Sequence, residues 1–248
     1  KDIENVNTVI EKWFIEGKYV PYCNDELKEV LKYAMRNVKM HTRISRIFRD
    51  IPVDNIIGGA RTPHLRQVLE NEMAEEGDYC KCIRSREIKN REFDIKDLFY
   101  EIEIYEASYG TEYFISANIE SDSDPFIPYL VGFCRLRLRN YNKVNVDFTK
   151  EHQNTNFINV LKDCALIREM HVYGRMVPSY LSKIEKSNSQ HRGIGSAMLK
   201  IAEKISVNQG FNKMAIISGV GVRGFYRKNG YKLEENYMTK RLTYNILN

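Results

Sequence analysis

The feature that most constrains the fold is a glycine-containing turn that leads directly into an amphipathic helix. The turn covers residues 190–195, and apolar residues then recur with helical spacing at Ile194, Met198, Ile201, Ala202 and Ile205. Gly193 and Gly195 let the backbone approach a ligand closely. The first N–H groups of a helix lack partners within the helix and carry the positive end of its dipole, so they attract phosphate. The turn therefore indicates a phosphate site, although an ordinary loop before a helix has the same pattern.

The spacing of apolar residues around this helix predicts a mostly antiparallel sheet. Apolar and polar residues alternate in three successive stretches, which is typical of a meander: 100–105, 113–117 and 130–139. Later strands are expected at 166–173, 214–217 and 237–244, with a helix at 223–229 that Gly230 ends. Upstream, we expect helices opened by Asn24 and by Thr62-Pro63, with a short β-rich stretch between them that stops at Pro52. We therefore divide the chain into a mainly helical segment, 1–98, and a domain of strands and helices, 99–248.

Charge is unevenly distributed along the chain. The formal net charge of +5 is only weak evidence for an anionic partner. The first segment, however, holds two basic runs: Lys32, Arg36, Lys39, Arg43, Arg46 and Arg49, then Lys81, Arg84, Arg86, Lys89 and Arg91. Such runs can follow a phosphate backbone, and a solvated basic face has the same appearance.

The cysteines and the apolar runs limit the cellular context. The five cysteines are odd in number and do not have the spacing of a disulfide framework, so we expect a reducing compartment and a cytoplasmic protein. No apolar run approaches the ~20 residues that cross a bilayer, so no membrane partner is expected. The chain starts at Lys1 rather than at Met, and we expect it to be a piece of a longer protein.

Several motifs together give the chain a specific resemblance. They span 46–52, 82–87, 168–174, 190–195 and 217–231. These stretches resemble the family of Elongator catalytic subunits, which are tRNA-modifying acetyltransferases of the GNAT superfamily, and the likeness extends from about Tyr19 to Leu242. The family joins a radical S-adenosylmethionine (radical SAM) domain to an acetyltransferase domain. The resemblance implies an α+β GNAT acyltransferase fold at 99–248, with a mixed, mostly antiparallel sheet flanked by helices. It also implies that 1–98 is a small, mainly helical remnant of a radical SAM domain with a tRNA-binding linker.

The resemblance also implies an activity. The family begins carboxymethylation of the wobble uridine in tRNA, uses acetyl-CoA, and holds the anticodon stem-loop between its two domains; accessory Elongator-type subunits are further partners. Its radical domain binds an iron–sulfur cluster through C-x-x-C-type cysteine triads. This sequence has no such triad, so we expect neither a cluster nor radical formation by this chain. Two alternatives are a protein lysine N-acetyltransferase and a non-catalytic tRNA-binding module with a vestigial acetyl-CoA site.

The resemblance assigns the cofactor site to two stretches and the following helix. The strand before the glycine turn is expected to splay open, so that its amides meet the pantetheine while the turn binds the pyrophosphate. The expected cofactor-binding residues are Met170, His171, Val172, Gln190, His191, Arg192, Gly193, Ile194, Gly195, Ser196, Tyr226 and Arg227.

Three residues are candidates for catalysis. Tyr226 is expected to donate a proton to the leaving thiolate, since a phenol can hydrogen-bond sulfur while staying protonated at neutral pH; the alternative is a core tyrosine beside Phe225. Glu169 is the candidate base, and its alternative is an exposed strand carboxylate. His171 fits a base, a cofactor contact or a core histidine, and we favour cofactor contact.

The remaining candidates concern tRNA and a metal. Arginines and lysines of the basic runs are expected to contact tRNA phosphates: Lys39, Arg43, Arg46, Arg49, Arg84 and Arg86. Cys80 and Cys82 could form half of a zinc site, with Cys134 as a further ligand. Some relatives carry C-x-C-x-x-C at this place, whereas the third position here is Ser85, which puts zinc in doubt. Buried free thiols are the alternative.

Overall fold

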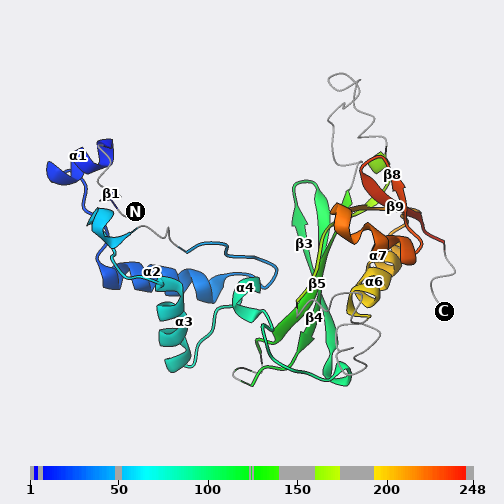
Figure 1. Ribbon diagram of the computed structural model, residues 1–248, viewed down its shortest axis with the longest axis horizontal. Helices are drawn as coiled ribbons and strands as arrows, with labels where there is room; N and C mark the ends of the chain where they lie inside the picture. The colour runs from blue at the N-terminus through cyan, green and yellow to red at the C-terminus, as the bar shows by residue number, and fades with distance from the viewer. Residues whose placement is uncertain are drawn as a thin grey trace. The chain divides into compact units, whose positions relative to one another are not determined.

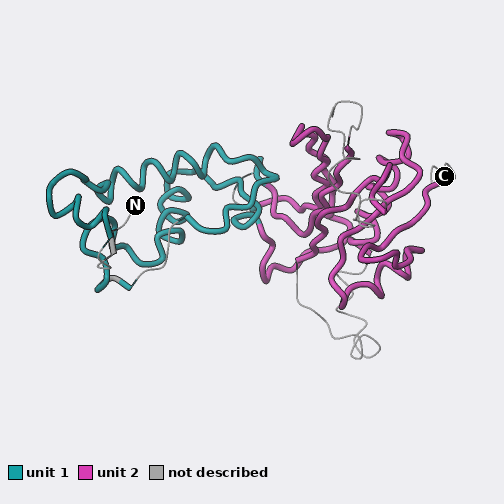
Figure 2. Tube along the Cα trace, turned by 90° about the horizontal axis from the view of Figure 1, so that it is seen from above, with its two compact units in different colours: residues 1–86, 122–127 teal, residues 87–121, 128–248 magenta. Residues whose placement is uncertain are grey.

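A computed structural model describes residues 3–4, 8–47, 52–122, 124, 126–139, 160–173 and 193–243. The chain forms two compact units (Figure 2). The first unit contains Lys1–Arg86 with Asp122–Ile127, and the second contains Glu87–Ser121 with Pro128–Asn248. The first unit therefore ends before the boundary near residue 98 that we expected from the change of periodicity.

The first unit is mainly helical, as predicted (Figure 1). Its elements are β1 (Ile3–Glu4), α1 (Val9–Ile15), α2 (Asn24–Asn37), the 3-10 turn η1 (Val53–Asn55), β2 (Ile56–Gly58), α3 (Leu65–Glu75) and α4 (Ile83–Arg86). Its core joins the apolar faces of α2 and α3 to the two cysteines before α4: Met35, Leu65, Leu69, Met73, Cys80 and Cys82.

Acidic residues on α3 and just after it form ion pairs with basic residues of α2, including the first two of the first basic run. Lys28 lies 2.5 Å from Glu72, and Lys32 lies 2.6 Å from Glu76. Arg36 pairs with Glu76 at 2.6 Å and also with Asp78. The sequence shows no acid within this run. The acids that pair with it, Glu72, Glu76 and Asp78, lie on α3 and just after it, about 40 residues further along the chain. The beginning of the run, Lys32 and Arg36, is therefore paired within the unit.

Three local predictions for this unit are wrong. Cys23, not Asn24, caps α2: its sulfur accepts from Glu26 N and Glu26 Oε2 accepts from its N–H. The third helix begins at Leu65 after His64, which has φ 51°, rather than at Thr62-Pro63. The described part of the expected β stretch, 44–47, is not a strand. Its backbone instead serves as an acceptor for arginine side chains, as described below.

The second unit is built on a seven-stranded sheet with the order β3-β4-β5-β6-β7-β9-β8. Its elements are the 3-10 turn η2 (Ile95–Asp97), β3 (Phe99–Ala107), β4 (Gly110–Ile119), β5 (Tyr129–Arg139), β6 (Ala165–Val172), α6 (Ile194–Asn208), β7 (Lys213–Ile217), the 3-10 turn η6 (Val220–Val222), α7 (Arg223–Lys228), β8 (Lys232–Glu234) and β9 (Tyr237–Arg241). The predicted meander and the later strands are confirmed, and β8 is an addition that the sequence reading missed.

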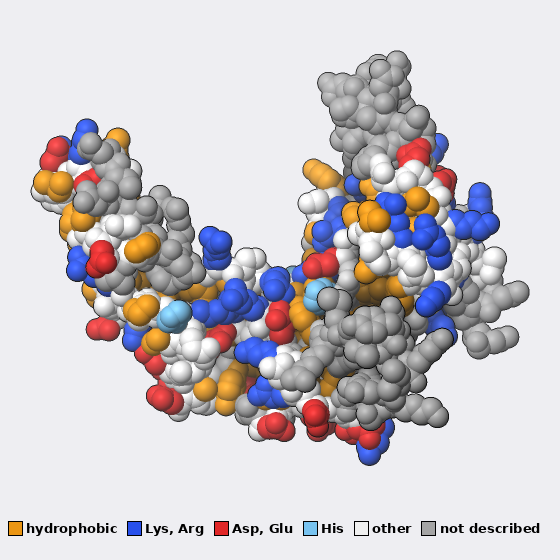
Figure 3. Space-filling view, viewed as in Figure 1, with side chains coloured by type: hydrophobic (Ala, Val, Ile, Leu, Met, Phe, Trp, Pro, Cys, Tyr) orange, Lys and Arg blue, Asp and Glu red, His pale blue; other side chains and the backbone are white. Residues whose placement is uncertain are grey.

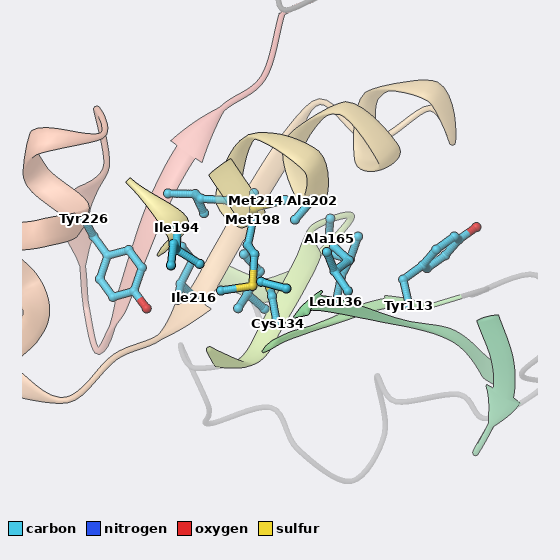
Figure 4. Packing of buried hydrophobic residues seen from close by; sticks show 14 of the residues in the cluster. Tyr113, Cys134, Leu136, Ala165, Ile194, Met198, Ala202, Met214, Ile216 and Tyr226 are labelled. Carbon is cyan, nitrogen blue, oxygen red and sulfur yellow. The ribbon is translucent and has the colours of Figure 1, made fainter. Parts of the chain in front are cut away.

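The strands pair antiparallel except for β6 and β7, which are parallel. Helix α6 packs against β4, β5 and β6 on one face of the sheet (Figure 1). The core fills this interface, and it includes Ile115, Cys134, Leu136, Ala165, Met198, Ala202, Met214 and Ile216 (Figure 4). The side chains of α6 that the sequence assigned to its apolar face are buried or partly buried there. Among the described residues, no helix combines the length and apolar character that crossing a membrane requires.

Candidate functional site

The sheet opens between β6 and β7. The two strands pair in parallel only over Ala165–Ile167, opposite Met214–Ile216. β6 continues to Val172 while paired with β5 alone. The end of β6 therefore has one edge without a strand partner among the described residues, as the resemblance predicted.

Alternation of the backbone determines which amides face this opening. Tyr173 N donates to Val131 O on β5 at 2.8 Å. Neighbouring residues of a strand direct their N–H groups to opposite sides. The N–H groups of Met170 and Val172 therefore point away from β5, toward the side from which β7 has separated. They are donors available to an extended ligand lying in the opening.

Helix α6 begins beside this opening. Gly193 is its N-cap with φ 103°, and it has no side chain with which to cap the first turn. Ala197 N donates to Gly193 O at 2.8 Å, which closes the first hydrogen bond of the helix. Ile194 is buried, and Ser196 is half-buried. The predicted ligand residues Gln190, His191 and Arg192 lie outside the described residues.

The first turn of α6, the end of β6 and α7 meet at Gly195. A Cβ at this position would lie 3.3 Å from Phe225 Cζ and 3.7 Å from Val172 Cγ2. A side chain here would require the Phe225 ring to shift by a few tenths of an ångström, so the site is tight. The first turn of α6 and the open edge of β6 therefore lie next to each other at Gly195.

Tyr226 projects from α7 toward this region of the core (Figure 4). It is 4% exposed, and the structure records no hydrogen bond from its hydroxyl to another described residue. Burial raises its pKa to about 12, and the nearby Cys134 thiol adds to this effect. The phenol is therefore protonated at neutral pH and can act as a donor rather than as a base.

The other two catalytic candidates lie on the opposite face of β6. Residues opposite one another in an antiparallel pair share a face, and the pairing places Met170 with the buried Cys134 and Glu169 with Arg135. Glu169 and His171 are exposed, and Glu169 forms an ion pair with Arg135 at 3.0 Å. Ala165 and Ile167 face the core, and the register shift between Ile167 and Glu169 turns Glu169 and His171 to the face opposite Tyr226.

Aromatic rings follow one another on this opposite face. Phe114 stacks on Phe133 with ring centroids 5.4 Å apart, and Phe133 lies 6.2 Å from the His171 ring. His171 also contacts Tyr173, with centroids 4.5 Å apart. The Arg135 guanidinium lies 5.1 Å from the centroid of Phe114. His171 is thus an exposed member of a supported aromatic row, and the sequence did not predict this row.

Helix α7 contributes two basic side chains of different kinds. Arg227, a predicted cofactor ligand, is exposed. Arg223, which we had not selected, is half-buried and its Nε has no hydrogen-bond partner in the described part of the chain. A buried donor without a partner is costly, so it marks a place where an acceptor group is expected. Only the packing distinguishes Arg223 from Arg227, because both lie in the motif at 217–231 and the sequence does not show which one is half-buried.

A buried polar network fixes the far end of α7. Tyr231 OH donates to Glu203 Oε1 at 2.7 Å, and Lys240 Nζ lies 2.8 Å from the same oxygen. Tyr231 N also donates to Tyr226 O at 3.0 Å. The network links α6, β9 and Tyr231, three residues beyond α7, and it therefore holds the backbone of Tyr226 relative to α6.

Most of the tRNA candidates in the first unit are exposed. Lys39, Arg43 and Arg46 are exposed, whereas Arg49 lies outside the described residues. Figure 3 shows Lys and Arg side chains gathered over the end of α2 and over α4. Arg84 is exposed and donates to Ser45 O at 2.8 Å.

The prediction that Arg86 contacts phosphate is wrong. Its side chain is 2% exposed, and it donates to Lys81 O at 3.0 Å and to Met40 O at 2.9 Å. Burial against backbone carbonyls makes it a structural arginine.

The cysteine pair does not fit a zinc ion. Cys80 and Cys82 are buried, but Ser85 and Arg66 complete the cluster in place of further metal ligands. No group of three or more His, Cys, Asp or Glu that could hold a metal is found among the described residues, and Cys134 lies in the core of the second unit. Hydrogen bonds from Cys80 and Ser85 and the Arg66 charge lower the pKa of Cys82, whereas the pKa of Cys80 is raised. Among the described residues, Cys80 and Cys82 therefore lack the further ligands that a zinc site needs.

Comparison with known proteins identifies relatives for both units. The Radical_SAM C-terminal domain family matches residues 6–75. Elongator complex protein 3 of Schizosaccharomyces pombe is 35% identical over 231 residues, which cover 91% of this chain and 39% of that protein. Over most of its length, the chain is a homologue of Elongator complex protein 3. The tRNA uridine(34) acetyltransferase of Methanocaldococcus jannaschii is 34% identical over 244 residues, which cover 95% of this chain and 41% of that protein.

A solved structure gives the same result for the fold. The archaeal Elp3 of Methanocaldococcus infernus, with its N-terminus deleted, superimposes with a TM-score of 0.74 at 30% identity and covers 98% of this chain and 54% of that one. The chain spans about two fifths of the length of the curated Elongator relatives. The comparisons confirm the predicted α+β fold, preceded by a helical part that matches the Radical_SAM C-terminal domain family.

Proposed function

We propose that this chain binds acetyl-CoA where β6 separates from β7 and, with tRNA bound, hydrolyses the thioester or transfers its acetyl group in wobble-uridine carboxymethylation. The observation that carries the proposal is the open edge of β6 at the uncapped head of α6, with Tyr226 packed beside both. Support for the tRNA part comes from the Methanocaldococcus jannaschii relative, which is named a tRNA uridine(34) acetyltransferase.

In this proposal the backbone binds the cofactor. The N–H groups at the head of α6 and the turn at 190–196 take the pyrophosphate, because a helix N-terminus favours an anion. The outward N–H groups of Met170 and Val172 hydrogen-bond the pantetheine and polarise the thioester carbonyl. The unpaired Nε of Arg223 is a further donor for an oxygen of the cofactor.

The chemical step needs one proton donor and one attacking group. A water molecule or another nucleophile attacks the thioester carbonyl, the C–S bond breaks, and the departing thiolate receives the Tyr226 proton. Glu169, oriented by Arg135, is the proposed base for the attacking group. Because Glu169 and His171 lie on the sheet face away from Tyr226, the attacker approaches from that face. The exposed ring of His171 offers a surface on which an RNA base can stack.

The proposed tRNA contacts in the first unit are to phosphates. Lys39, Arg43, Arg46 and Arg49 provide charge without reading sequence, and Arg84 adds charge while holding Ser45. This mode of binding weakens with rising salt concentration.

The decisive experiment measures thiol release from acetyl-CoA by this chain, alone, with tRNA and with lysine peptides. We expect release that depends on tRNA and is unaffected by peptides. Peptide acetylation without a tRNA effect would instead support a lysine N-acetyltransferase. Retained tRNA binding with no thiol release under any condition would support a non-catalytic tRNA-binding module.

A further inference from the structure

The first unit contains a polar cluster centred on the Arg66 guanidinium. Four of its N–H directions are used: Nε donates to Glu70 Oε1 at 2.9 Å, Nη1 to Ile44 O at 2.9 Å, and Nη2 to Cys82 Sγ at 3.0 Å and to Ser85 Oγ at 2.9 Å. Ser85 in turn donates to Glu70 Oε1 at 2.7 Å. The side chain of Arg66 is only 16% exposed. The guanidinium is therefore enclosed, and hydrogen-bond acceptors from several segments pair with its N–H groups.

This geometry competes directly with a metal ion. A zinc–sulfur bond is about 2.3 Å long, so a zinc ion on Cys82 would need the space that the guanidinium fills. The third thiolate of a C-x-C-x-x-C motif is replaced by the Ser85 hydroxyl, which here accepts from Arg66. The donor set thus suits a planar cation with several N–H groups rather than a tetrahedral metal.

The cluster also fixes the segment that carries the exposed basic residues. Three arginines donate to its backbone carbonyls: Arg66 to Ile44 O, Arg84 to Ser45 O and Arg86 to Met40 O. Within the same unit, Ile83 N donates to Thr42 O at 2.9 Å. This segment is neither helix nor strand, so side chains supply the partners that regular structure would otherwise provide.

We propose that the cluster of Arg66, Glu70, Cys80, Cys82 and Ser85 is a metal-independent clamp. The Arg66 guanidinium donates to the Cys82 sulfur that a zinc ion would need as a ligand, and it ties α3 and α4 to segment 40–45. Arg66 is accordingly a positioning residue for the basic segment. The inference concerns the first unit alone and does not depend on acetyl transfer.

The first test is metal binding. The chain is incubated with excess zinc, desalted and analysed for metal, and we expect far less than one zinc per chain. Chelator treatment should leave the thermal midpoint unchanged. Stoichiometric zinc that survives desalting, or a lower midpoint after chelation, would overturn the proposal.

The second test exchanges the guanidinium for a metal, with cobalt as the spectroscopic probe. Ser85→Cys alone should not show thiolate-to-cobalt charge-transfer bands, because Arg66 still fills the position. The double variant Arg66→Ala with Ser85→Cys should show them, since space and a third thiol are then present. Bands in the single variant, or none in a folded double variant, contradict the assignment.

The third test asks whether Arg66 positions the segment. Arg66→Gln should accelerate hydrogen exchange at the Thr42 and Ile83 amides by about tenfold or more, because loss of a charged donor loosens the segment that they bond. Arg61→Gln, an exposed arginine of the same unit, is the matched control and should leave both amides unchanged. Equal exchange in the two variants refutes the positioning role. Should Arg66→Gln not fold, the zinc and chelator measurements on the unaltered chain decide the matter.

Discussion

Replacement of Tyr226 by Phe tests the proposed proton donor with little disturbance of the fold. The ring fills a core site and is 4% exposed, while its hydroxyl has no recorded hydrogen bond to another described residue. Phe keeps the buried ring and its edge contact with Phe225, whose centroid lies 5.1 Å away. We therefore expect the free energy of unfolding to change by less than about 0.5 kcal/mol.

The magnitude of the catalytic effect follows from the protonation state of Tyr226. Its pKa of about 12 lies two units above the ordinary value of 10, so ionising the phenol in place costs about 3 kcal/mol more than in water. The phenol is therefore protonated at neutral pH, so the donor is present when the thiolate departs. Loss of a positioned general acid lowers a rate by about 100-fold to 10,000-fold. We expect a loss of that size in kcat for thiol release, with acetyl-CoA affinity unchanged within about twofold.

The assay is tRNA-stimulated thiol release, followed together with acetyl-CoA binding by calorimetry. Tyr113→Phe is the matched control, since Tyr113 is a buried tyrosine of the same core placed well away from Tyr226 (Figure 4). The sign of the pH effect follows from the raised pKa: the donor is present below pH 12 and is lost only as pH rises through that value. Full activity of Tyr226→Phe, or an activity loss in the unaltered chain near pH 10 that the variant abolishes, would refute the reasoning.

Three further predictions concern the cofactor turn, the α7 network and the basic segment. Gly193→Ala places a side chain at φ 103°, so strain of about 1–3 kcal/mol should weaken acetyl-CoA binding by about 5-fold to 150-fold in calorimetry. Tyr231→Phe removes its 2.7 Å bond to Glu203 and should lower the free energy of unfolding in urea by about 1.5–3 kcal/mol. Joint replacement of Arg43 and Arg46 by Gln should reduce the salt dependence of tRNA binding by about two counterions.

Each of these predictions has its own control and its own contrary outcome. Gly219→Ala lies in open space without a positive φ, and it should leave acetyl-CoA affinity unchanged; an equal loss there removes the strain argument. Tyr113→Phe again serves for the urea experiment, and equal stability of both tyrosine variants would show that the Glu203 bond is not stabilising. Arg61→Gln should keep the salt slope, and a slope unaffected by the Arg43 and Arg46 changes would place the RNA elsewhere.

The second unit was predictable because its patterns are local and strong. Two patterns each fit a single kind of secondary structure: the alternation at 100–105 and 130–139 fits strands, and the apolar stripe from Ile194 to Ile205 fits a helix. The turn was recognised from Gly193 and Gly195 directly before the helical stripe, and Gly193 indeed has φ 103°, a value that favours glycine. The hairpin strand β8 was missed because its three residues are exposed and give no alternation of burial.

The first unit was harder to predict because its partners are distant in sequence. The basic run from Lys32 reads as unbroken positive charge, yet Glu72 and Glu76 neutralise its beginning. Arg86 looked equal to Arg84, and only packing buries the one and exposes the other. Charge patterns along a chain do not reveal which charges will meet, because ion pairs form between helices that the fold brings together.

The candidate site shows the same division. The sequence pointed to Tyr226, Glu169 and His171 through a resemblance, without their arrangement. The register shift in β6 placed Glu169 and His171 on the face opposite Tyr226, and the unpaired Nε of Arg223 became visible only in the packed structure. Their roles stay predictions until the variants are measured.

Local periodicity and the steric freedom of glycine were enough to establish the sheet, the central helix and the turn before it, since each depends on neighbours within a few residues. Tertiary structure alone decided where β6 leaves β7, which face each side chain occupies and which cation stands beside Cys82. Those outcomes depend on contacts between segments far apart in the chain, and the energy of burying a charge or opening a sheet is set by whatever the fold places next to it.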